Sequence, residues 1–171
     1  MKIVLLGYMS SGKTSVGKLL ANKLKLNFTD LDQEIEEVTG NTVSKIFSEK
    51  GELFFRKKEM EVLRDILRID QGMVLALGGG TPCYGNNMEL VNQNTLHSFY
   101  LQLSIGNLVA RIAKEKSQRP LVAAISNDEL PEFIGKHLFE RAPYYAQANY
   151  TIDCNGKTEK EVADAIQLQL V

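Results

Sequence analysis

The stretch Lys2-Ile3-Val4-Leu5-Leu6-Gly7-Tyr8-Met9-Ser10-Ser11-Gly12-Lys13-Thr14 decides the fold of this chain. Its first part is rich in apolar residues and predicts a β-strand that runs directly into a glycine-bounded turn. The turn has the spacing Gly-x-x-x-x-Gly-Lys-Thr over residues 7–14, and apolar residues recur at helical spacing from Val16 to Leu24 behind it. Strand, loop and helix in this order are the context that a phosphate-binding loop requires.

The residues of this loop match the needs of a polyphosphate. Phosphate oxygens require several donors at short range, and glycines let the backbone approach closely while the helix start adds favourable dipole charge. Lys13 would bridge the β- and γ-phosphates, and Thr14 would hold a Mg²⁺ ion. The alternative is a Gly/Ser turn that matches by chance, but the apolar strand before it and the amphipathic helix after it favour a site for a nucleoside triphosphate.

The composition is typical of a globular domain. The 171 residues are 44% hydrophobic and 24% charged, which predicts a single domain over residues 1–171 with a sizeable core. A net charge of −1 argues against a nucleic-acid partner, because such partners select a basic surface. No apolar run approaches about 20 residues, so we expect no membrane segment, no signal peptide and a cytoplasmic location. Cys83 and Cys154 share no metal-ligand spacing and are expected to be buried or inert thiols.

Strand and helix patterns alternate along the chain, which predicts an α/β fold with a mostly parallel sheet. Five strands are expected, at residues 2–6, 26–29, 73–77, 96–101 and 149–154. Thr158 to Glu161 form a capping-box pattern that predicts the start of a last helix. The segment 114–127 is polar and without a clear period, and we expect it to be a mobile loop. His97 lies in strand alternation without a carboxylate or cysteine partner, so no chemical role is expected for it.

Two carboxylates follow the second expected strand, in Asp30-Leu31-Asp32. If the extended geometry persists, Asp30 and Asp32 point to the same side at the carboxyl end of the strand, where open α/β sheets bind ligands. Carboxylates on one side repel each other unless a cation or a donor-rich ligand holds them. A solvated turn or a helix cap is the alternative, and the neighbouring phosphate loop favours a ligand site.

An arginine interrupts the apolar stripe of the helix expected over residues 52–69. The stripe consists of Leu53, Met60, Leu63 and Leu67. Arg56 completes it at spacing 3, 4, 3, 4, and a guanidinium in a core-facing position is costly unless an anion meets it. One explanation is a structural salt bridge, and Glu59 is close enough in sequence to hold Arg56 in place. The other is an anionic ligand.

A second arginine takes an inward position in the helix expected over residues 128–147. Arg141 lies three residues after Leu138 and four before Tyr145, in line with Ile134. Pro143 is expected to kink or restart this helix. Two inward arginines on different helices favour an anion pocket over two unrelated salt bridges.

Gly78-Gly79-Gly80 follow the apolar strand at 73–77, where many phosphate-loop proteins carry an acidic metal ligand. Bare backbone suits the close approach of a ligand or a γ-phosphate, so the carboxylate for the metal must come from Asp30-Leu31-Asp32. Arg119 lies in the polar segment, where a closing lid with an arginine would exclude water and neutralise charge. A plain surface arginine is the alternative there.

Taken together, these motifs resemble those of shikimate kinases, and the resemblance covers essentially the whole chain. It rests on residues 7–14, Asp30-Leu31-Asp32, Phe55-Arg56, Gly78-Gly79-Gly80, Arg119-Pro120-Leu121 and Arg141-Ala142-Pro143. It implies a three-layer α/β/α fold of the P-loop NTPase type, similar to nucleoside-monophosphate kinases, with substrate-binding helices near residues 32–60 and a mobile lid near 112–127. Ser10 stands where the family commonly has glycine, and the stretch 114–127 differs from other members, as lids usually do.

The resemblance also implies a function, the phosphorylation of the 3-hydroxyl of shikimate by MgATP on the route to chorismate and the aromatic amino acids. Catalysis is then assigned to Lys13, Asp32 and Arg119, and Mg²⁺ binding to Thr14 and Asp30. The implied shikimate contacts are Asp32, Arg56, Gly78, Gly79, Gly80, Arg141, Phe47 and Phe55. The implied nucleotide contacts are Ser10, Ser11, Gly12, Lys13, Thr14, Ser15, Arg111, Arg119 and Asn155. The protein is expected to be a monomer with small-molecule partners, without nucleic acid or membrane.

Two other functions are considered against this one. A kinase for another small hydroxy acid, such as gluconate, shares the phosphate loop and an anionic acceptor, but Asp32, Arg56, Gly79 and Arg141 together favour shikimate. A GTP-dependent switch should carry an Asn-Lys-x-Asp motif, which the sequence lacks. A non-catalytic nucleotide module should lack Lys13 or Asp32, and both are present.

Overall fold

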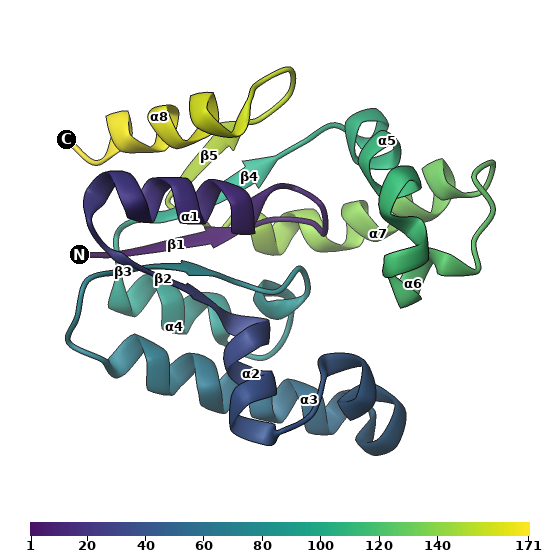
Figure 1. The fold of residues 1–171 in the computed structure, drawn as a ribbon, viewed down its shortest axis with the longest axis horizontal. Helices are drawn as coiled ribbons and strands as arrows, with labels where there is room; N and C mark the ends of the chain where they lie inside the picture. The colour runs from purple at the N-terminus through teal and green to yellow at the C-terminus, as the bar shows by residue number, and fades with distance from the viewer.

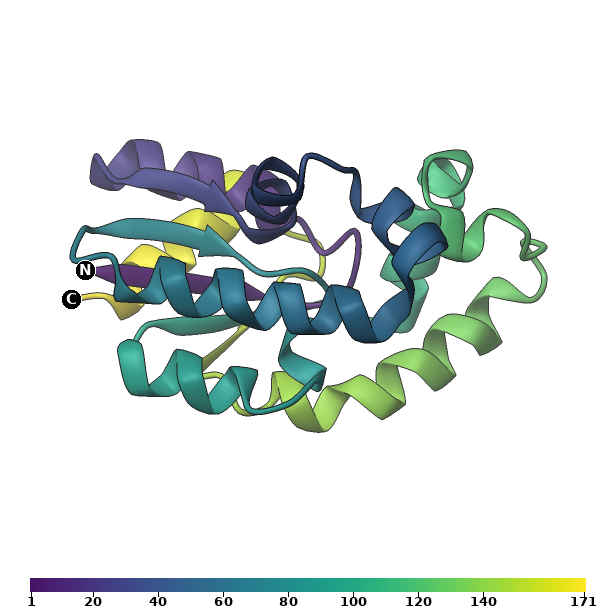
Figure 2. The same ribbon diagram turned by 90° about the horizontal axis from the view of Figure 1, so that it is seen from below.

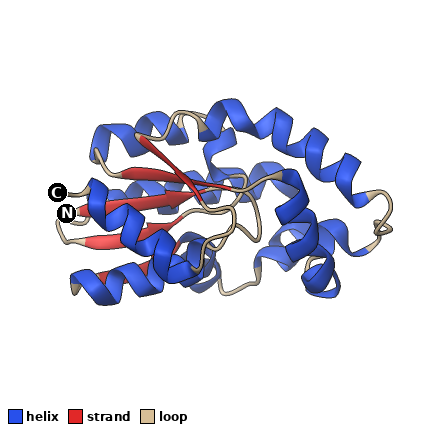
Figure 3. Cartoon of the chain, turned by 90° about the horizontal axis from the view of Figure 1, so that it is seen from above, coloured by secondary structure: helices blue, strands red, loops and turns tan.

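The computed structural model describes residues 1–171, apart from the side chain of Pro120. Its centre is a sheet of five parallel strands in the order β2-β3-β1-β4-β5. The strands are β1 (Lys2–Leu6), β2 (Asn27–Asp30), β3 (Met73–Ala76), β4 (Ser98–Gln102) and β5 (Tyr150–Asp153). The prediction of five strands in a parallel sheet is confirmed, and the strand arrows all run toward the same side of the molecule (Figure 3).

Helices cover both faces of this sheet, as the three-layer arrangement requires. α1 and α8 pack together on one face, and α3 and α4 lie on the other (Figures 1 and 2). The helices are α1 (Lys13–Leu24), α2 (Leu31–Thr39), α3 (Val43–Arg68), α4 (Asn87–Asn94), α5 (Ile105–Glu115), α6 (Pro120–Ala123), α7 (Leu130–Tyr145) and α8 (Glu159–Gln169), with 3₁₀ turns η1 (Thr81–Cys83) and η2 (Lys116–Gln118). None of the helices described is long and apolar enough to reach across a bilayer.

β1 is the centre of the core, and it carries the phosphate-binding loop at its end. The side chains from Ile3 to Leu6 have no exposed surface, and Val74 and Leu75 of the adjacent β3 are equally buried. Parallel strands that are covered on both faces are expected to be continuous apolar runs, which is what the sequence contains here. The loop is therefore anchored on the most deeply buried part of the molecule.

The chain does not stay extended after β2, so the expected geometry of Asp30-Leu31-Asp32 is wrong. Asp30 is the last strand residue and the N-cap of α2, and its Oδ1 accepts a hydrogen bond of 3.2 Å from the backbone N–H of Gln33. Such a cap stabilises a helix by about 1 kcal/mol, and the fully buried Leu31 anchors the first turn. Asp32 therefore enters the site from the start of a helix rather than from a strand.

The second half of α3 faces the core with a different stripe from the one expected. Gly51 breaks the helix with a φ of 83°, as its position in the sequence indicates. The buried side chains beyond it are Phe55, Glu59, Val62, Leu63, Ile66 and Leu67. Leu53 is 88% exposed, so its place in the stripe is wrong, because Phe55 and Arg56 take the inward direction at that turn.

Three further expectations concern the segment 114–127, Pro143 in α7 and the start of α8. The segment 114–127 is not an irregular loop, because it contains η2 and α6. α7 continues through Pro143 to Tyr145 and does not restart, since the missing N–H falls in its last turn. The capping box of α8 is confirmed, with Thr158 accepting from the N–H of Glu161 and the Glu161 carboxylate accepting from the N–H of Thr158.

Candidate active site

A cavity of about 490 Å³ opens at the carboxyl ends of β1, β2 and β3. It is lined by residues 10–15, which form the end of the loop after β1 and the start of α1, by Asp30 and Asp32, and by Arg111 and Arg119 from the region of α5. Gly78 and Gly79, after β3, complete its floor. The structure thus brings most of the residues that the sequence assigned to a nucleotide to one hollow.

The loop around this hollow depends on backbone conformations that favour glycine. Gly7 has a φ of 152°, and a Cβ placed there would lie 2.9 Å from the backbone oxygen of Leu101. Gly12 has a φ of 95° and caps the start of α1. Ser10 adopts a left-handed φ of 63°, which glycine reaches without steric cost and serine does not. The loop therefore holds Ser10 in a conformation that glycine would adopt more easily.

Lys13 places its ammonium inside the loop. Its Nζ donates hydrogen bonds of 2.7 Å to the backbone oxygen of Gly7 and 3.0 Å to that of Tyr8. Burial lowers the pKa of Lys13 to about 8, although the Asp32 carboxylate favours the charged form. The loop therefore encloses a positive charge whose proton is held less tightly than in an ordinary lysine.

Thr14 and Asp30 form a pair of oxygen donors at the mouth of the loop. The Thr14 hydroxyl donates to Asp30 Oδ2 over 3.3 Å. No cluster of three or more histidine, cysteine or acidic side chains suited to a metal occurs among the residues described. Mg²⁺ is usually held by one or two carboxylates together with substrate phosphates and water, so this pair fits Mg²⁺ that arrives with a nucleotide.

Asp32 lies deeper in the same cavity. A Cβ at Gly78 would lie 3.0 Å from Asp32 Oδ1, so the carboxylate rests directly against bare backbone. Burial raises the pKa of Asp32 to about 6, with further repulsion from Asp30 and Glu59 and an opposing attraction from Lys13. A carboxylate with this pKa is suited to exchange a proton near neutral pH.

Three charged side chains from three helices meet the turn Gly78-Gly79-Gly80. Asp32 from α2 lies against Gly78, as just described. Arg141 from α7 lies against Gly79, where a Cβ would be 3.3 Å from its Nη1. Arg56 from α3 lies against Gly80, where a Cβ would be only 2.6 Å from its Nη2. Each of the three glycines thus leaves room for one charged side chain. Their backbone forms the floor of a site that one carboxylate and two guanidinium groups border.

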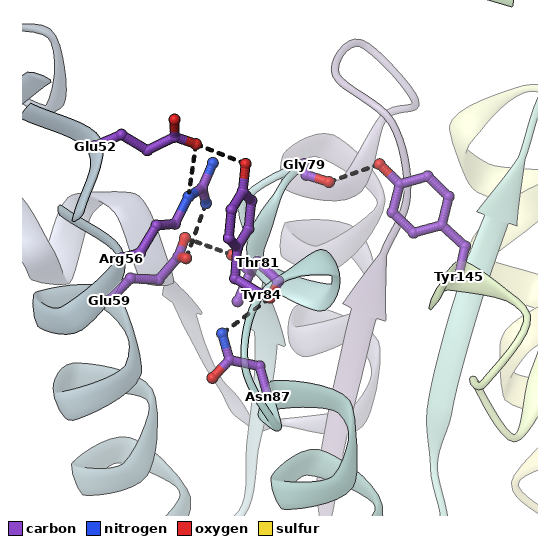
Figure 4. A network of polar contacts seen from close by, with 8 residues as sticks. All are labelled: Glu52, Arg56, Glu59, Gly79, Thr81, Tyr84, Asn87 and Tyr145. Carbon is purple, nitrogen blue, oxygen red and sulfur yellow. Dashed lines mark hydrogen bonds and ion pairs between the residues drawn. The ribbon is translucent and has the colours of Figure 1, made fainter. Parts of the chain in front are cut away.

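Arg56 is held by a chain of buried polar contacts (Figure 4). Its Nη1 donates to Glu59 Oε1 at 2.9 Å, and Glu59 is 1% exposed. The hydroxyl of Thr81 donates to the other Glu59 oxygen at 2.8 Å, and the Asn87 side chain donates to the Thr81 backbone oxygen at 2.9 Å. A structural salt bridge to Arg56 therefore exists, yet it engages one edge of the guanidinium and leaves the buried Nε without a hydrogen-bond partner in the described part of the chain.

Aromatic rings surround the same arginine. Phe47 and Phe55 lie 4.5 Å apart between ring centroids, at 5.9 and 5.2 Å from Arg56 Cζ. Phe55 is buried, and Phe47 is 36% exposed. The two rings are thus close enough to Arg56 to form a wall beside it.

Tyr145 and Tyr8 support the turn and Arg141 from the other side. The Tyr145 hydroxyl donates to the backbone oxygen of Gly79 at 2.6 Å (Figure 4). The Arg141 guanidinium lies 5.8 Å from the ring centroid of Tyr8, whose hydroxyl is 2.9 Å from Nδ1 of His137. The sequence pattern placed Tyr145 only in an apolar stripe, because such a pattern carries no information about the partner of a buried hydroxyl.

Arg119 reaches the loop through a glutamate that the sequence analysis missed. Nε and Nη2 of Arg119 donate to Glu115 Oε2 at 3.1 Å, and the hydroxyl of Ser10 donates to the same oxygen at 2.8 Å. Arg111 donates to the backbone oxygen of Ser10 at 3.1 Å. Glu115 lies in a stretch of similar polar residues, in which none stands out by type or spacing. The sequence therefore did not indicate that Glu115 contacts the loop.

Asn155 is placed differently from the other nucleotide candidates. It is not part of the cavity lining, and its Oδ1 accepts from the backbone N–H of Ser104 at 2.9 Å and from Asn107 at 2.7 Å. Glu159, which the sequence did not single out, lines the cavity near the start of α8. Pro120, part of a quoted motif, has a side chain outside the described portion of the structure.

Comparison with known proteins agrees over nearly the whole chain. A family model described as shikimate kinase matches residues 9–171. A curated shikimate kinase of Flavobacterium psychrophilum is 48% identical over 165 residues, which is 96% of each chain. One of Flavobacterium johnsoniae is 40% identical over the same length and the same shares.

Solved structures give the same result. The crystal structure of shikimate kinase from Bacteroides thetaiotaomicron superposes with a TM-score of 0.92 at 36% identity, covering 99% of this chain and 98% of the other. Shikimate kinase from Acinetobacter baumannii in complex with shikimate superposes with a TM-score of 0.88 at 34% identity, covering 99% and 92%. The structural similarity therefore extends over nearly the whole chain.

Proposed function

Because the chain belongs to the shikimate kinase family, we propose that its residues divide the reaction of that family between a nucleotide half and an acceptor half of the site. The reaction is the ATP-dependent phosphorylation of the 3-hydroxyl of shikimate, which yields shikimate 3-phosphate and ADP. ATP is the co-substrate and Mg²⁺ the metal ion, and the product serves the synthesis of chorismate and the aromatic amino acids.

The acceptor half is built on the turn Gly78-Gly79-Gly80. We assign the shikimate carboxylate to Arg56 and Arg141, because guanidinium groups bind carboxylates through paired N–H donors. The backbone N–H groups of Gly79 and Gly80 donate to a ring hydroxyl of shikimate. The Asp32 carboxylate accepts a hydrogen bond from the 3-hydroxyl. One observation carries this assignment: one carboxylate and two guanidiniums converge over three consecutive glycines. A small acid with an anionic end and a hydroxylated end matches that pattern.

We assign the remaining contacts from the resemblance to shikimate kinases. Phe47 and Phe55 wall the ring of the acceptor. The backbone of Ser10, Ser11, Gly12 and Ser15 would surround the phosphates, and we assign Arg111 and Asn155 to the base, with Asn155 outside the cavity lining. Thr14 and Asp30 would hold the Mg²⁺ ion, which neutralises phosphate charge when it is bound.

The chemical step requires positioning and charge more than covalent help. The 3-hydroxyl oxygen forms a bond to the γ-phosphorus while the bond from that phosphorus to the bridging oxygen breaks, and its electron pair leaves on ADP. The hydroxyl proton passes to the Asp32 carboxylate, whose raised pKa of about 6 suits this transfer. Lys13 and Arg119 neutralise the charge that spreads over the transferring group.

We also propose that the chain is a single domain over residues 1–171 that works as a cytoplasmic monomer. Within it, residues 32–60 form the acceptor-binding helices and residues 112–127 form the lid. The contacts of Arg119 and Ser10 with Glu115 support the lid assignment, because they join that segment to the phosphate-binding loop.

The test is a coupled ADP-release assay with shikimate and a panel of other small hydroxy acids, gluconate among them. Shikimate should give turnover, and Arg56→Ala and Arg141→Ala should each raise its KM by about 10- to 100-fold, since hydrogen bonds to charged groups contribute roughly 1.5–3 kcal/mol. The KM for ATP should stay within about twofold, because neither arginine belongs to the nucleotide half. Arg68→Ala, at the exposed end of α3, is the matched control.

Two results would contradict the proposal. One is turnover with another acid and none with shikimate. The other is an equal rise in the KM for shikimate and the KM for ATP in the arginine variants. That result would make Arg56 and Arg141 structural residues.

A further inference from the structure

Tyr84 makes the closest aromatic contact with Arg56. The Arg56 Cζ lies 3.9 Å from the centroid of the Tyr84 ring, against 5.2 Å for Phe55 and 5.9 Å for Phe47. A cation over an aromatic face is attracted within about 6 Å of the centroid, and the attraction increases as the distance falls. Figure 4 shows the guanidinium lying against this ring, between Tyr84 and the helix that carries Arg56.

The hydrogen bonds of Arg56 do not by themselves fix the plane of its guanidinium. Nη1 is bound to Glu59, while the buried Nε has no hydrogen-bond partner in the part of the chain described. A single hydrogen bond locates one nitrogen and still allows the plane to turn about that bond. A ring packed against the face of the guanidinium removes this freedom.

Tyr84 is itself held in place by a second residue of α3. Its hydroxyl donates to Glu52 Oε1 at 2.6 Å, and the same oxygen lies 3.7 Å from Arg56 Nε. Tyr84 follows η1, whereas Glu52 and Arg56 lie on consecutive turns of α3 beyond the Gly51 break. The tyrosine thus connects the turn that forms the acceptor floor with the helix that supplies the arginine.

We propose that Tyr84 is a positioning residue for the acceptor, one that sets the plane of the Arg56 guanidinium so that its free N–H groups meet a planar carboxylate edge-on. Two parallel N–H···O bonds to a carboxylate require the two planar groups to be nearly coplanar. A guanidinium already fixed in that plane loses less freedom when the acceptor binds. This inference rests on the proposed role of Arg56 in binding the shikimate carboxylate.

The experiment is a double-mutant cycle in the full-length enzyme, read as kcat and KM for each substrate. Tyr84→Leu should raise the KM for shikimate by about 5- to 30-fold, equivalent to roughly 1–2 kcal/mol, and leave kcat and the KM for ATP within about twofold. Tyr84→Phe keeps the ring and should stay within about threefold of the wild type. In an Arg56→Ala background, Tyr84→Leu should have no further effect on kcat/KM, because the group that it positions is gone.

The control is Tyr144→Leu, since Tyr144 is 39% exposed and Tyr84 36%. It should leave both KM values unchanged, and the thermal midpoints of all variants report on folding. If Arg56→Ala weakens shikimate binding but Tyr84→Leu does not, the inference is wrong and the proposed function stands. An undiminished effect of Tyr84→Leu in the Arg56→Ala background overturns it as well. If Arg56→Ala leaves the KM for shikimate at its wild-type value, the assigned role of Arg56 fails, and this inference fails with it.

Discussion

Asp32 carries a charge that the folded protein disfavours. Burial and the nearby carboxylates raise its pKa from 3.8 to about 6. An acid whose pKa is raised on folding binds its proton more tightly in the native state than in the unfolded chain. The contribution of protonated Asp32 to the free energy of unfolding is therefore complete below about pH 4, and it is lost as the pH rises through 6. At neutral pH the carboxylate is ionised at a cost to the fold, as is common for groups in active sites.

A bell-shaped pH dependence of kcat/KM is expected from this residue and from Lys13. The acid limb should fall near pH 6, where Asp32 must lose its proton, and the alkaline limb near pH 8, where Lys13 loses its charge. Asp32→Asn should lower kcat by about 10²-fold or more and remove the acid limb. It should also raise the thermal midpoint at pH 8, by an amount that shrinks as the pH approaches 4.

Glu37→Gln, at an exposed position of the same helix, is the control for Asp32→Asn and should change neither profile. Circular dichroism of both variants checks that the fold is retained. Near-normal turnover of Asp32→Asn, or an acid limb that persists in it, would remove the role assigned to this carboxylate.

At the scale of elements, the sequence predicted what periodicity and short motifs determine. β1, its loop and α1 follow from an apolar run, a glycine spacing and an amphipathic repeat. Periodicity did not predict α2, because the preceding strand suggested continued extension, and a helix cap was only the alternative for Asp30. The spacing of Asp30 and Gln33, which is that of a capping box, pointed to this alternative, and the family resemblance implied helices over residues 32–60. α6 has four residues, fewer than a helical period needs to become visible.

The supporting contacts of the site could not be predicted, because they join segments that are far apart in the sequence. Tyr84 and Arg56 are 28 positions apart, and nothing in either local pattern pairs them. The motif arginines were identifiable because a charge in an apolar stripe is conspicuous. The tyrosines and Glu115 were not, since their residue types are ordinary for the positions that they occupy.

The turn after β3 offers a direct test of how one element serves the site. Gly80 has an ordinary φ of −94°, so alanine there meets no backbone strain, but its Cβ would lie 2.6 Å from Arg56 Nη2. Gly80→Ala should displace the guanidinium and raise the KM for shikimate by about tenfold or more, if one charged hydrogen bond is lost. The KM for ATP should not change.

Gly106→Ala is the matched control for Gly80→Ala. Gly106 lies in α5, and nothing lies within 4 Å of a Cβ placed there. This variant should keep both KM values and gain up to about 1 kcal/mol in the free energy of unfolding, because alanine is the better helix former. A wild-type KM for shikimate in Gly80→Ala would show that Arg56 has room to move aside without losing its function.

At the scale of the whole molecule, the order of the strands joins the two halves of the site. β1 lies between β3 and β4, so the loop after β1 and the turn after β3 are neighbours. A Cβ at Gly79 would lie 3.4 Å from the backbone N of Met9 and 3.3 Å from Arg141 Nη1. The proposed nucleotide half and acceptor half therefore share a floor within a single core, and we expect them to unfold together.

One cooperative thermal transition is expected for a monomer of 19.1 kDa, as checked by calorimetry and light scattering. Shikimate at 100 times its Kd should stabilise the wild type by about 2.7 kcal/mol in the free energy of unfolding. At the same shikimate concentration, a 10- to 100-fold weaker Arg141→Ala should keep only about 1.4 to 0.4 kcal/mol of this increment, while the increment given by ADP stays unchanged. A particle of twice the mass, or two separate transitions, would contradict the single-domain monomer.

The bare turn at Gly78-Gly79-Gly80 also bears on inhibition and resistance. A compound that imitates the acceptor acid would rest on backbone that presents no side chain, so resistance cannot arise by trimming a contact there. Any replacement residue adds a Cβ toward Asp32, Arg141 or Arg56, at 3.0, 3.3 and 2.6 Å respectively. A change that excludes the inhibitor at this floor therefore also disturbs a charge that we assign to binding of the natural acceptor. Resistance to such a compound would have to arise from changes in other parts of the pocket.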